Sequence, residues 1–301
     1  MSSLRVLRRR IRSVQNTQQI TKAMEMVAAS KLRRAQSKAL SARPYAVKIS
    51  EMLGNLAGAA SELDHPLFKA REVKNVALVL VTSDRGLCGA YNTNLLRAAE
   101  QRLRGAAPGA PAGAEHPGAG GAAGPSARLV LVGKKGRDYF RRRKYPVLAV
   151  YTPVPAEASL EFAKQLTQEL IGRFVSGEVD RVELMFTRFI SALRRRVVTE
   201  TFLPVGAERA EGHPSPAGAI FEPDAESIFA ELLPRYATAK LFASLADALA
   251  SEHSARMIAM GSARKNAGEL MDLLVLRRNR LRQAAITKEL LDIVGGAEAL
   301  K

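Results

Sequence analysis

Two short glycine-containing turns are the segments whose residues could bind a phosphate group. The first, TSDRGLCGAYN (Thr82 to Asn92), follows an apolar run and precedes a helical pattern, so its backbone N–H groups could face an anion. The second is VGKKGRD (Val132 to Asp138). Neither has the glycine spacing of a dinucleotide-binding turn or the Lys-Ser/Thr ending of a P-loop. A tight turn between a strand and a helix is therefore the favoured interpretation of both.

The chain offers little else for catalysis or metal binding. Its four histidines are scattered without paired-ligand spacing, which argues against a metal site: His65, His116, His213 and His253. Cys88 lies in the first turn with no neighbouring histidine in the sequence, so a structural role is favoured over that of a nucleophile. As the single cysteine among 301 residues, it also excludes an intramolecular disulfide and a multi-cysteine metal centre. We expect no cofactor.

Positive charge is the strongest compositional signal. The 46 Lys and Arg residues exceed the 29 Asp and Glu residues by 17. Residues 1–50 contain 12 of these basic residues with Glu25 as the single acid, and residues 264–288 contain seven against Glu269 and Asp272. A solvated helix face normally mixes both signs. A surface of one sign indicates an acidic partner, either the phosphates of a nucleic acid or acidic protein chains.

The elements that carry this charge are two long helices at the ends of the chain. The first is expected from Leu4 to about Ala60, with Pro44 kinking it. In the first part of this helix, Leu4, Leu7, Ile11 and Val14 follow heptad spacing. Continuing this stripe to Ile20, Met24 and Val27 requires a register shift. The later part follows a heptad stripe: Leu32, Ala35, Ala39, Ala42, Ala46, Ile49, Leu53, Leu56 and Ala60.

The second long helix is expected after Asp224, a candidate N-cap, and Gly295 with Gly296 should stop it. Its stripe contains Ala246, Leu249, Met260, Ala263, Ala267, Leu270, Leu274, Leu281, Ala284 and Leu291. Narrow stripes on both helices predict that the two pair with each other as a coiled coil. The alternative, two helices wrapped on a globular core, requires wider apolar faces.

Strands alternating with helices between these rods predict an inserted small α/β domain with a mostly parallel sheet. Strands are expected at 76–82, 128–133, 182–189 and 197–203, the last two as an antiparallel hairpin at an edge, and helices at 91–103, 136–144 and 156–176. Residues 105–127 comprise 7 Gly, 9 Ala and 4 Pro among 23 and are predicted to be a disordered insertion. A linker is expected at 205–223. The predicted domains are residues 1–60, 73–204 and 224–295.

The sequence contains no transmembrane segment, because its longest apolar run, Val76 to Val81, falls far short of the roughly 20 residues needed to cross a bilayer. The N-terminal stretch MSSLRVLRRRIRSV lacks the apolar core of a secretory signal and any cleavage boundary. We therefore expect it to belong to the mature protein, with an Arg-rich transit peptide as the alternative.

These patterns leave two functions open, a basic coiled coil that binds nucleic acid and a basic shaft held inside a protein assembly. A nucleotide-dependent enzyme that uses the turn at 82–92 is a third possible function and is less favoured. Three segments resemble the gamma subunit of F-type ATP synthase: IRSVQNTQQITKAMEMVAASKLRRAQ (11–36), SDRGLCGAYNTNL (83–95), and SEHSARMIAM (251–260) with RLRQAAITKELLDIVGGAEAL (280–300). The resemblance spans nearly the whole chain and favours the shaft.

The resemblance implies a rotor without a catalytic residue of its own. In that family the two long helices form an antiparallel coiled coil inside a ring of three alpha and three beta subunits, and the α/β domain rests on the membrane c-ring. Proton-driven rotation of the c-ring turns the shaft, which changes the conformation of the beta subunits for ATP synthesis. The epsilon subunit is a further partner, and one copy of the chain serves each complex. The implied location is the cytoplasmic face of the bacterial inner membrane, as a peripheral protein.

The resemblance also implies which residues contact the beta subunits. They are Lys22 and Met24 in TKAMEMV, and Arg282, Gln283 and Thr287 in RQAAITKEL. Met24 equally fits the helix seam. Contact with the c-ring and the epsilon subunit is expected near 202–209. The paired regulatory cysteines of chloroplast members are absent, which excludes that kind of thiol control.

Overall fold

The computed structural model describes residues 4–59, 65–68, 71–105, 126–205 and 225–298. It consists of two compact units, residues 1–29 with 256–301, and residues 30–255. Most of the expected insertion at 105–127 lies outside the described residues, except that the second strand begins at Ser126, inside it. The linker after Val205 and the candidate N-cap Asp224 also lie outside the described residues.

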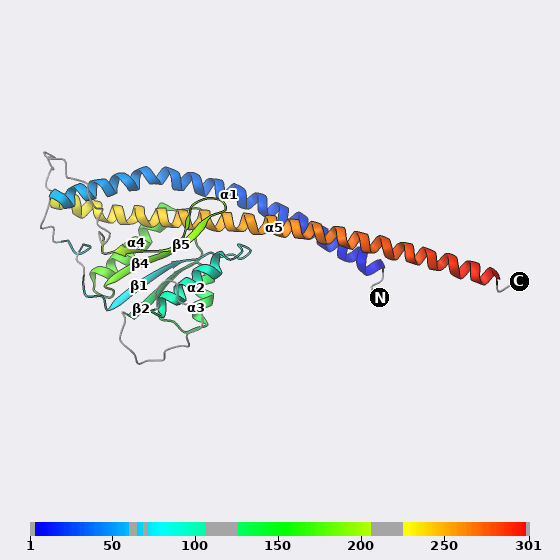
Figure 1. Ribbon diagram of the computed structural model, residues 1–301. Helices are drawn as coiled ribbons and strands as arrows, with labels where there is room; N and C mark the ends of the chain where they lie inside the picture. The colour runs from blue at the N-terminus through cyan, green and yellow to red at the C-terminus, as the bar shows by residue number, and fades with distance from the viewer. Residues whose placement is uncertain (1–3, 60–64, 69–70, 106–125, 206–224, 299–301) are drawn as a thin grey trace. The chain divides into compact units, whose positions relative to one another are not determined.

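The two long helices are α1 (Leu4–Ala59) and α5 (Ala225–Glu298), drawn in blue and in yellow to red in Figure 1. Each continues through an internal proline, Pro44 in α1 and Pro234 in α5. The expected stop at Gly295 and Gly296 is wrong, because α5 runs through both glycines to Glu298. Gly295 does not adopt the positive φ that a glycine C-cap requires.

In the first unit, α1 and α5 pair as antiparallel helices. A Cβ added at Gly268 would lie 3.0 Å from Nε2 of Gln18, and one added at Gly261 would lie 3.2 Å from Oε1 of Glu25. Moving seven residues forward along α1, from Gln18 to Glu25, thus corresponds to moving seven residues backward along α5, from Gly268 to Gly261. The register is constant over this stretch, and glycine at both contacts lets the helices approach closely.

The α1 seam in this unit keeps a single heptad register, so the register shift predicted from the apolar residues is wrong. Buried or half-buried residues follow one another at alternating steps of three and four: Leu4, Leu7, Ile11, Val14, Gln18, Thr21, Glu25 and Ala28. Polar residues occupy three successive seam positions, and the Thr21 hydroxyl is satisfied by donating to the Thr17 carbonyl at 3.0 Å. Ile20 and Val27 are left 60% and 56% exposed.

Three residues expected in the α5 seam are exposed instead, namely Leu270, Ala284 and Leu291. The constant register places Arg282 level with about residue 4, so α5 extends roughly 24 Å beyond the first described residue of α1. Leu291 therefore has no described α1 residue beside it. Met260 and Ala267, by contrast, are buried as expected.

The second unit contains a five-stranded sheet with the order β3-β2-β1-β4-β5. The strands are β1 (Asn75–Val81), β2 (Ser126–Val132), β3 (Val147–Tyr151), β4 (Arg181–Phe189) and β5 (Arg195–Leu203). All pairs are parallel except β4 with β5, which form the expected antiparallel hairpin at the edge. The mostly parallel sheet is confirmed, whereas β3 was not predicted.

Helices cover both faces of this sheet (Figure 1). One face packs against α2 (Tyr91–Leu103) and α3 (Lys134–Arg141), with Leu95 and Phe140 fully buried. The other face packs against α4 (Leu160–Val175) and the part of α5 from Leu233 to Ala248. The first part of α5 therefore belongs to the hydrophobic core of the α/β unit.

Candidate functional site

The sheet has the architecture in which ligands bind beyond the carboxyl ends of the strands, at the point where the strand order reverses. In this sheet that point follows β1, which lies between β2 and β4 in parallel with both. The turn predicted as a candidate phosphate site, 82–92, begins there. The structure thus allows a direct test of whether a ligand has room.

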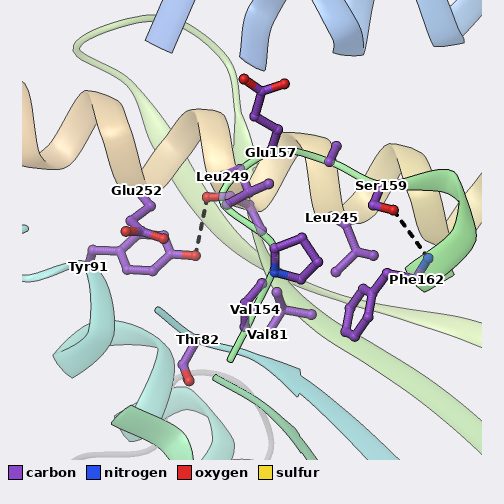
Figure 2. A pocket seen from close by; sticks show the side chains of 13 residues that line it. Val81, Thr82, Tyr91, Val154, Glu157, Ser159, Phe162, Leu245, Leu249 and Glu252 are labelled. Carbon is purple, nitrogen blue, oxygen red and sulfur yellow. Dashed lines mark hydrogen bonds between the residues drawn. The ribbon is translucent and has the colours of Figure 1, made fainter. Parts of the chain in front are cut away.

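The crevice beyond β1 is filled by the chain itself (Figure 2). Leu245 and Leu249 from α5, and Val154 from the loop after β3, lie around the end of β1. The Tyr91 hydroxyl donates to the backbone carbonyl of Ala248 at 3.3 Å, which ties the start of α2 to α5. The remaining cavity is about 10 Å³, close to the volume that one water molecule requires. A nucleotide does not fit.

The polar groups of the first turn bond to one another. The Asn92 side-chain oxygen accepts from the Ser83 backbone N–H at 3.1 Å, and its amide donates to the Cys88 sulfur at 3.2 Å. The Ser83 hydroxyl donates to the Arg85 carbonyl at 2.7 Å. Cys88 is 2% exposed, as expected for a structural cysteine. This network fixes a tight turn between a strand and a helix.

The second turn offers the N-terminus of α3, but side chains of the same unit already occupy it. Asp84 accepts from the Lys134 N–H at 2.8 Å, and the Thr82 hydroxyl accepts from the Gly136 N–H at 2.9 Å. The other oxygen of Asp84 accepts from the Val154 N–H at 2.7 Å. The carboxylate therefore takes the place that a bound anion would have at this helix end, and it joins the loops that follow three strands.

The described part of the chain contains no group of three or more His, Cys, Asp and Glu side chains arranged to hold a metal ion. Within the same part, no helix has an apolar stretch long enough to cross a lipid bilayer. The region expected to contact the c-ring and the epsilon subunit, 202–209, is described only to Val205. Phe202, Leu203 and Val205 are buried in the core of the α/β unit. These three residues are therefore not exposed for contact with another subunit.

The residues predicted to contact the beta subunits lie at two levels of the helix pair in the first unit. Lys22 is exposed and Met24 is half-buried beside the seam, while Arg282, Gln283 and Thr287 are all exposed. In the constant register, Arg282 is level with about residue 4, roughly 27 Å along the axis from Lys22. The structure therefore does not bring the two sets together.

Nine arginines surround the helix pair at the level of Arg282, and we call them the arginine collar. Residues 4–12 of α1 are level with about residues 274–282 of α5 in the antiparallel register. Both segments lack acidic residues, and they contain Arg5, Arg8, Arg9, Arg10 and Arg12 of α1 with Arg277, Arg278, Arg280 and Arg282 of α5. All are exposed except Arg278, which is half-buried. Such density of one charge sign attracts an acidic partner.

Exposed apolar side chains lie near both levels, and the sequence pattern placed three of them, Ile20, Val27 and Leu291, in the helix stripes instead. Ile20, Met26 and Val27 of α1 are 60%, 59% and 56% exposed. Near the end of α5, five large apolar residues are at least half exposed: Ile286, Leu290, Leu291, Ile293 and Val294. Apolar surface of this extent marks a protein interaction site. For α1 the signal was present in the sequence, because Ile20, Met26 and Val27 fall off the heptad that Leu4, Leu7, Ile11 and Val14 define.

Comparison with known proteins agrees with this arrangement. The family model described as ATP synthase matches residues 3–300. The chain is 45% identical to the ATP synthase gamma chain of Moorella thermoacetica and 46% identical to that of Desulforamulus reducens, with 100% of each chain covered. It is 40% identical to the ATP synthase gamma chain of a Nostoc species, again over the full length of both.

A solved structure of the mitochondrial ATP synthase of Euglena gracilis contains a chain with the same fold. The TM-score is 0.67 at 19% sequence identity, and the match covers 99% of this chain and 94% of that one. The long paired helices, the inserted sheet and the full-length sequence matches agree with one another. The chain therefore belongs to the gamma chains of ATP synthase, the family that forms the central rotor shaft of that enzyme.

Proposed function

We propose that this chain transmits torque through the paired helices of its first unit, by contacts with the catalytic beta subunits. The arginine collar is the observation that carries the proposal, because nine cations at one level require an acidic surface around them. Arg282 and Lys22 contribute charge pairing, and Gln283 and Thr287 contribute hydrogen bonds to a beta-subunit loop. Met24 adds an apolar contact beside the seam.

The exposed apolar residues near the end of α5 support an enclosed position for this helix. Five large side chains at least half exposed to water make an unfavourable surface for a free helix. A ring of three alpha and three beta subunits around the helix would cover them. One copy of the chain serves each such ring.

Catalysis belongs to the partner subunits in this proposal. The filled crevice after β1 and the occupied N-terminus of α3 leave no room for a nucleotide at the two turns predicted as candidate phosphate sites. Proton-driven rotation of the c-ring turns the chain, and the beta subunits change conformation and make ATP. The epsilon subunit and the c-ring contact the α/β unit, and the complex lies at the cytoplasmic face of the bacterial inner membrane.

Co-expression with alpha and beta subunits tests the proposal. A stoichiometric complex should form, and the double substitution Arg282→Ala with Gln283→Ala should lower its ATP hydrolysis rate without preventing assembly. The matched control is Lys265→Ala with Asn266→Ala, which removes a similar exposed cation and amide from the same helix. Equal losses in both variants would contradict the assignment. A chain that elutes alone, bound to nucleic acid until salt is raised, would support a basic nucleic-acid-binding protein instead.

A further inference from the structure

The second unit contains a cavity of about 200 Å³ that the rotor function does not use. α1 lines it with Lys31, Arg34, Ala35 and Lys38, α5 lines it with Leu249 and His253, and the loop before α4 lines it with residues 156–158. This cavity is far larger than the one at the end of β1. It is smaller than the roughly 300–1,000 Å³ of a site for a whole drug-sized ligand, so it suits a small ion or one group of a larger molecule.

Cations from one face of α1 converge on this cavity. Lys31, Arg34 and Lys38 recur at steps of three and four residues, which places them on the same side of the helix. The single acidic residue among the lining residues is Glu157, so three cations face one carboxylate. Figure 2 shows the Glu157 side chain pointing away from the end of β1 and toward the blue ribbon.

Glu157 already acts as an anion bound to these cations. The Lys38 ammonium donates to the Glu157 carboxylate at 2.6 Å, and an Arg34 guanidinium nitrogen lies 3.5 Å from its other oxygen. The hydrogen bond and charge of Lys38 hold the pKa of Glu157 below its usual value, so the carboxylate stays ionised. The Lys38 ammonium also lies within 3.5 Å of the Ala158 carbonyl, so one lysine joins α1 to this loop.

We propose that this cavity binds a phosphate group, with Lys31, Arg34 and Lys38 as its ligands and Glu157 as an internal competitor. Arginine and lysine are the side chains that bind phosphate oxygens best. A phosphate carries more charge than the carboxylate and offers more acceptor oxygens, so it can engage all three cations at once. Its binding releases Glu157 from Lys38 and Arg34, which frees the loop at 156–158 from α1.

The phosphate group can belong to free inorganic phosphate or to the end of a nucleotide. The Arg34 and Lys38 side chains are 69% and 40% exposed, so the site is open to water and its contacts are partly screened. We expect dissociation constants on the order of millimolar. The inference does not depend on the rotor proposal, because every group involved belongs to this chain.

The test measures binding to the purified full-length chain by calorimetry at fixed ionic strength, with inorganic phosphate, pyrophosphate and ADP as separate probes. Saturation by inorganic phosphate identifies the free ion as sufficient, and saturation by ADP alone identifies a nucleotide phosphate. The double substitution Arg34→Gln with Lys38→Gln should weaken binding at least tenfold. Glu157→Gln removes the competitor and should strengthen binding about twofold to fivefold, the range expected for an exposed ion pair.

Arg33→Gln is the matched control, because Arg33 adjoins Arg34 on α1 but is not among the lining residues. It removes one positive charge, where the double substitution removes two, and should leave binding unchanged. The proposal is overturned if no probe saturates, if Arg33→Gln weakens binding as much as the double substitution, or if Glu157→Gln fails to strengthen it. The substituted side chains are exposed or half-buried, and circular dichroism would verify that each variant folds.

Discussion

The Glu25 carboxylate lies 2.8 Å from the Nε of Arg264, across the pair of long helices. Glu25 is the single acidic residue among the first 50, and it occupies a seam position opposite Gly261. A glycine at that point leaves space for the carboxylate to reach the arginine. The pair thus joins α1 to α5 where the apolar seam is interrupted.

Removing either partner of this pair should weaken the helix pairing only modestly. The side chains are 29% and 44% exposed, so Glu25→Gln or Arg264→Gln should lower the free energy of unfolding by at most about 1 kcal/mol. A double-mutant cycle in urea would measure the coupling. The exposed pair Lys265 and Glu269, 3.9 Å apart within one helix, is the control and should show less. A coupling energy of zero for Glu25 and Arg264 would refute the contact.

Three glycine-to-alanine substitutions should change stability in different directions. Gly172→Ala should stabilise the chain by about 0.5–1 kcal/mol, because a Cβ there meets nothing within 4 Å and alanine favours the helix. Gly136→Ala should destabilise it by about 1–3 kcal/mol, because the Cβ would lie 3.0 Å from the buried Thr82 hydroxyl. Gly133→Ala should be worst, since φ is +100° and the Cβ would lie 2.2 Å from the Thr82 carbonyl oxygen. Thermal unfolding gives the order, and a neutral Gly133→Ala would contradict it.

Removing Arg102 from its ion pair with Glu183 should lower the free energy of unfolding more than replacing both partners. The guanidinium donates twice to the carboxylate, at 3.0 and 2.7 Å, and the Glu183 side chain is 8% exposed. Arg102→Met leaves that carboxylate buried without its cation and should cost about 2–4 kcal/mol. Adding Glu183→Leu should recover most of the loss, as measured by denaturant unfolding.

Arg104→Met serves as the comparison for this pair. Its partner Glu100 lies 3.8 Å away and keeps a second cation, Arg143, at 3.0 Å. The loss should therefore be smaller than for Arg102→Met. Equal losses would show that burial of Glu183 is not the cause.

The α/β unit should lose stability in acid, because Glu169 stabilises it only while its carboxylate is ionised. Burial raises the pKa of Glu169, but hydrogen bonds from Tyr151 and Arg173 and the charge of Arg173 outweigh it and lower the pKa. A carboxyl group with a lowered pKa in the folded state contributes stability above its unfolded pKa of about 4.3, and the contribution is lost as pH falls. Burial and Glu169 together raise the pKa of the Tyr151 hydroxyl, which therefore stays protonated as the donor.

The melting temperature as a function of pH tests this prediction. The wild-type chain should melt above the Glu169→Gln variant at neutral pH, and the two should converge as pH falls below about 4.3 and through the lowered pKa of the folded state. Glu161→Gln, at the start of the same helix, is the control for a general charge effect. A gap between wild type and Glu169→Gln that persists into acid would contradict the role of ionisation.

The two long helices and four of the five strands could be predicted from the sequence. Heptad spacing from Leu4 to Val14 and the apolar runs at 76–82 and 128–133 are local patterns, and burial on one helix face or on both sheet faces produces them directly. The edge strand β3 was missed although VLAVY is apolar throughout, and as an edge strand it leaves Val147 and Val150 40% and 43% exposed.

The packing of the polar and small residues could not be predicted from the sequence. Gln18 and Glu25 continue the seam because Gly268 and Gly261 on the other helix make room for them, a complementarity invisible in either helix alone. The crevice after β1 is closed by Leu245 and Leu249, more than 150 residues later in the chain. The ion pair between Lys38 and Glu157 likewise joins two segments, 119 residues apart in the chain. Contacts between distant segments depend on packing, whereas periodicity depends only on neighbours along one element.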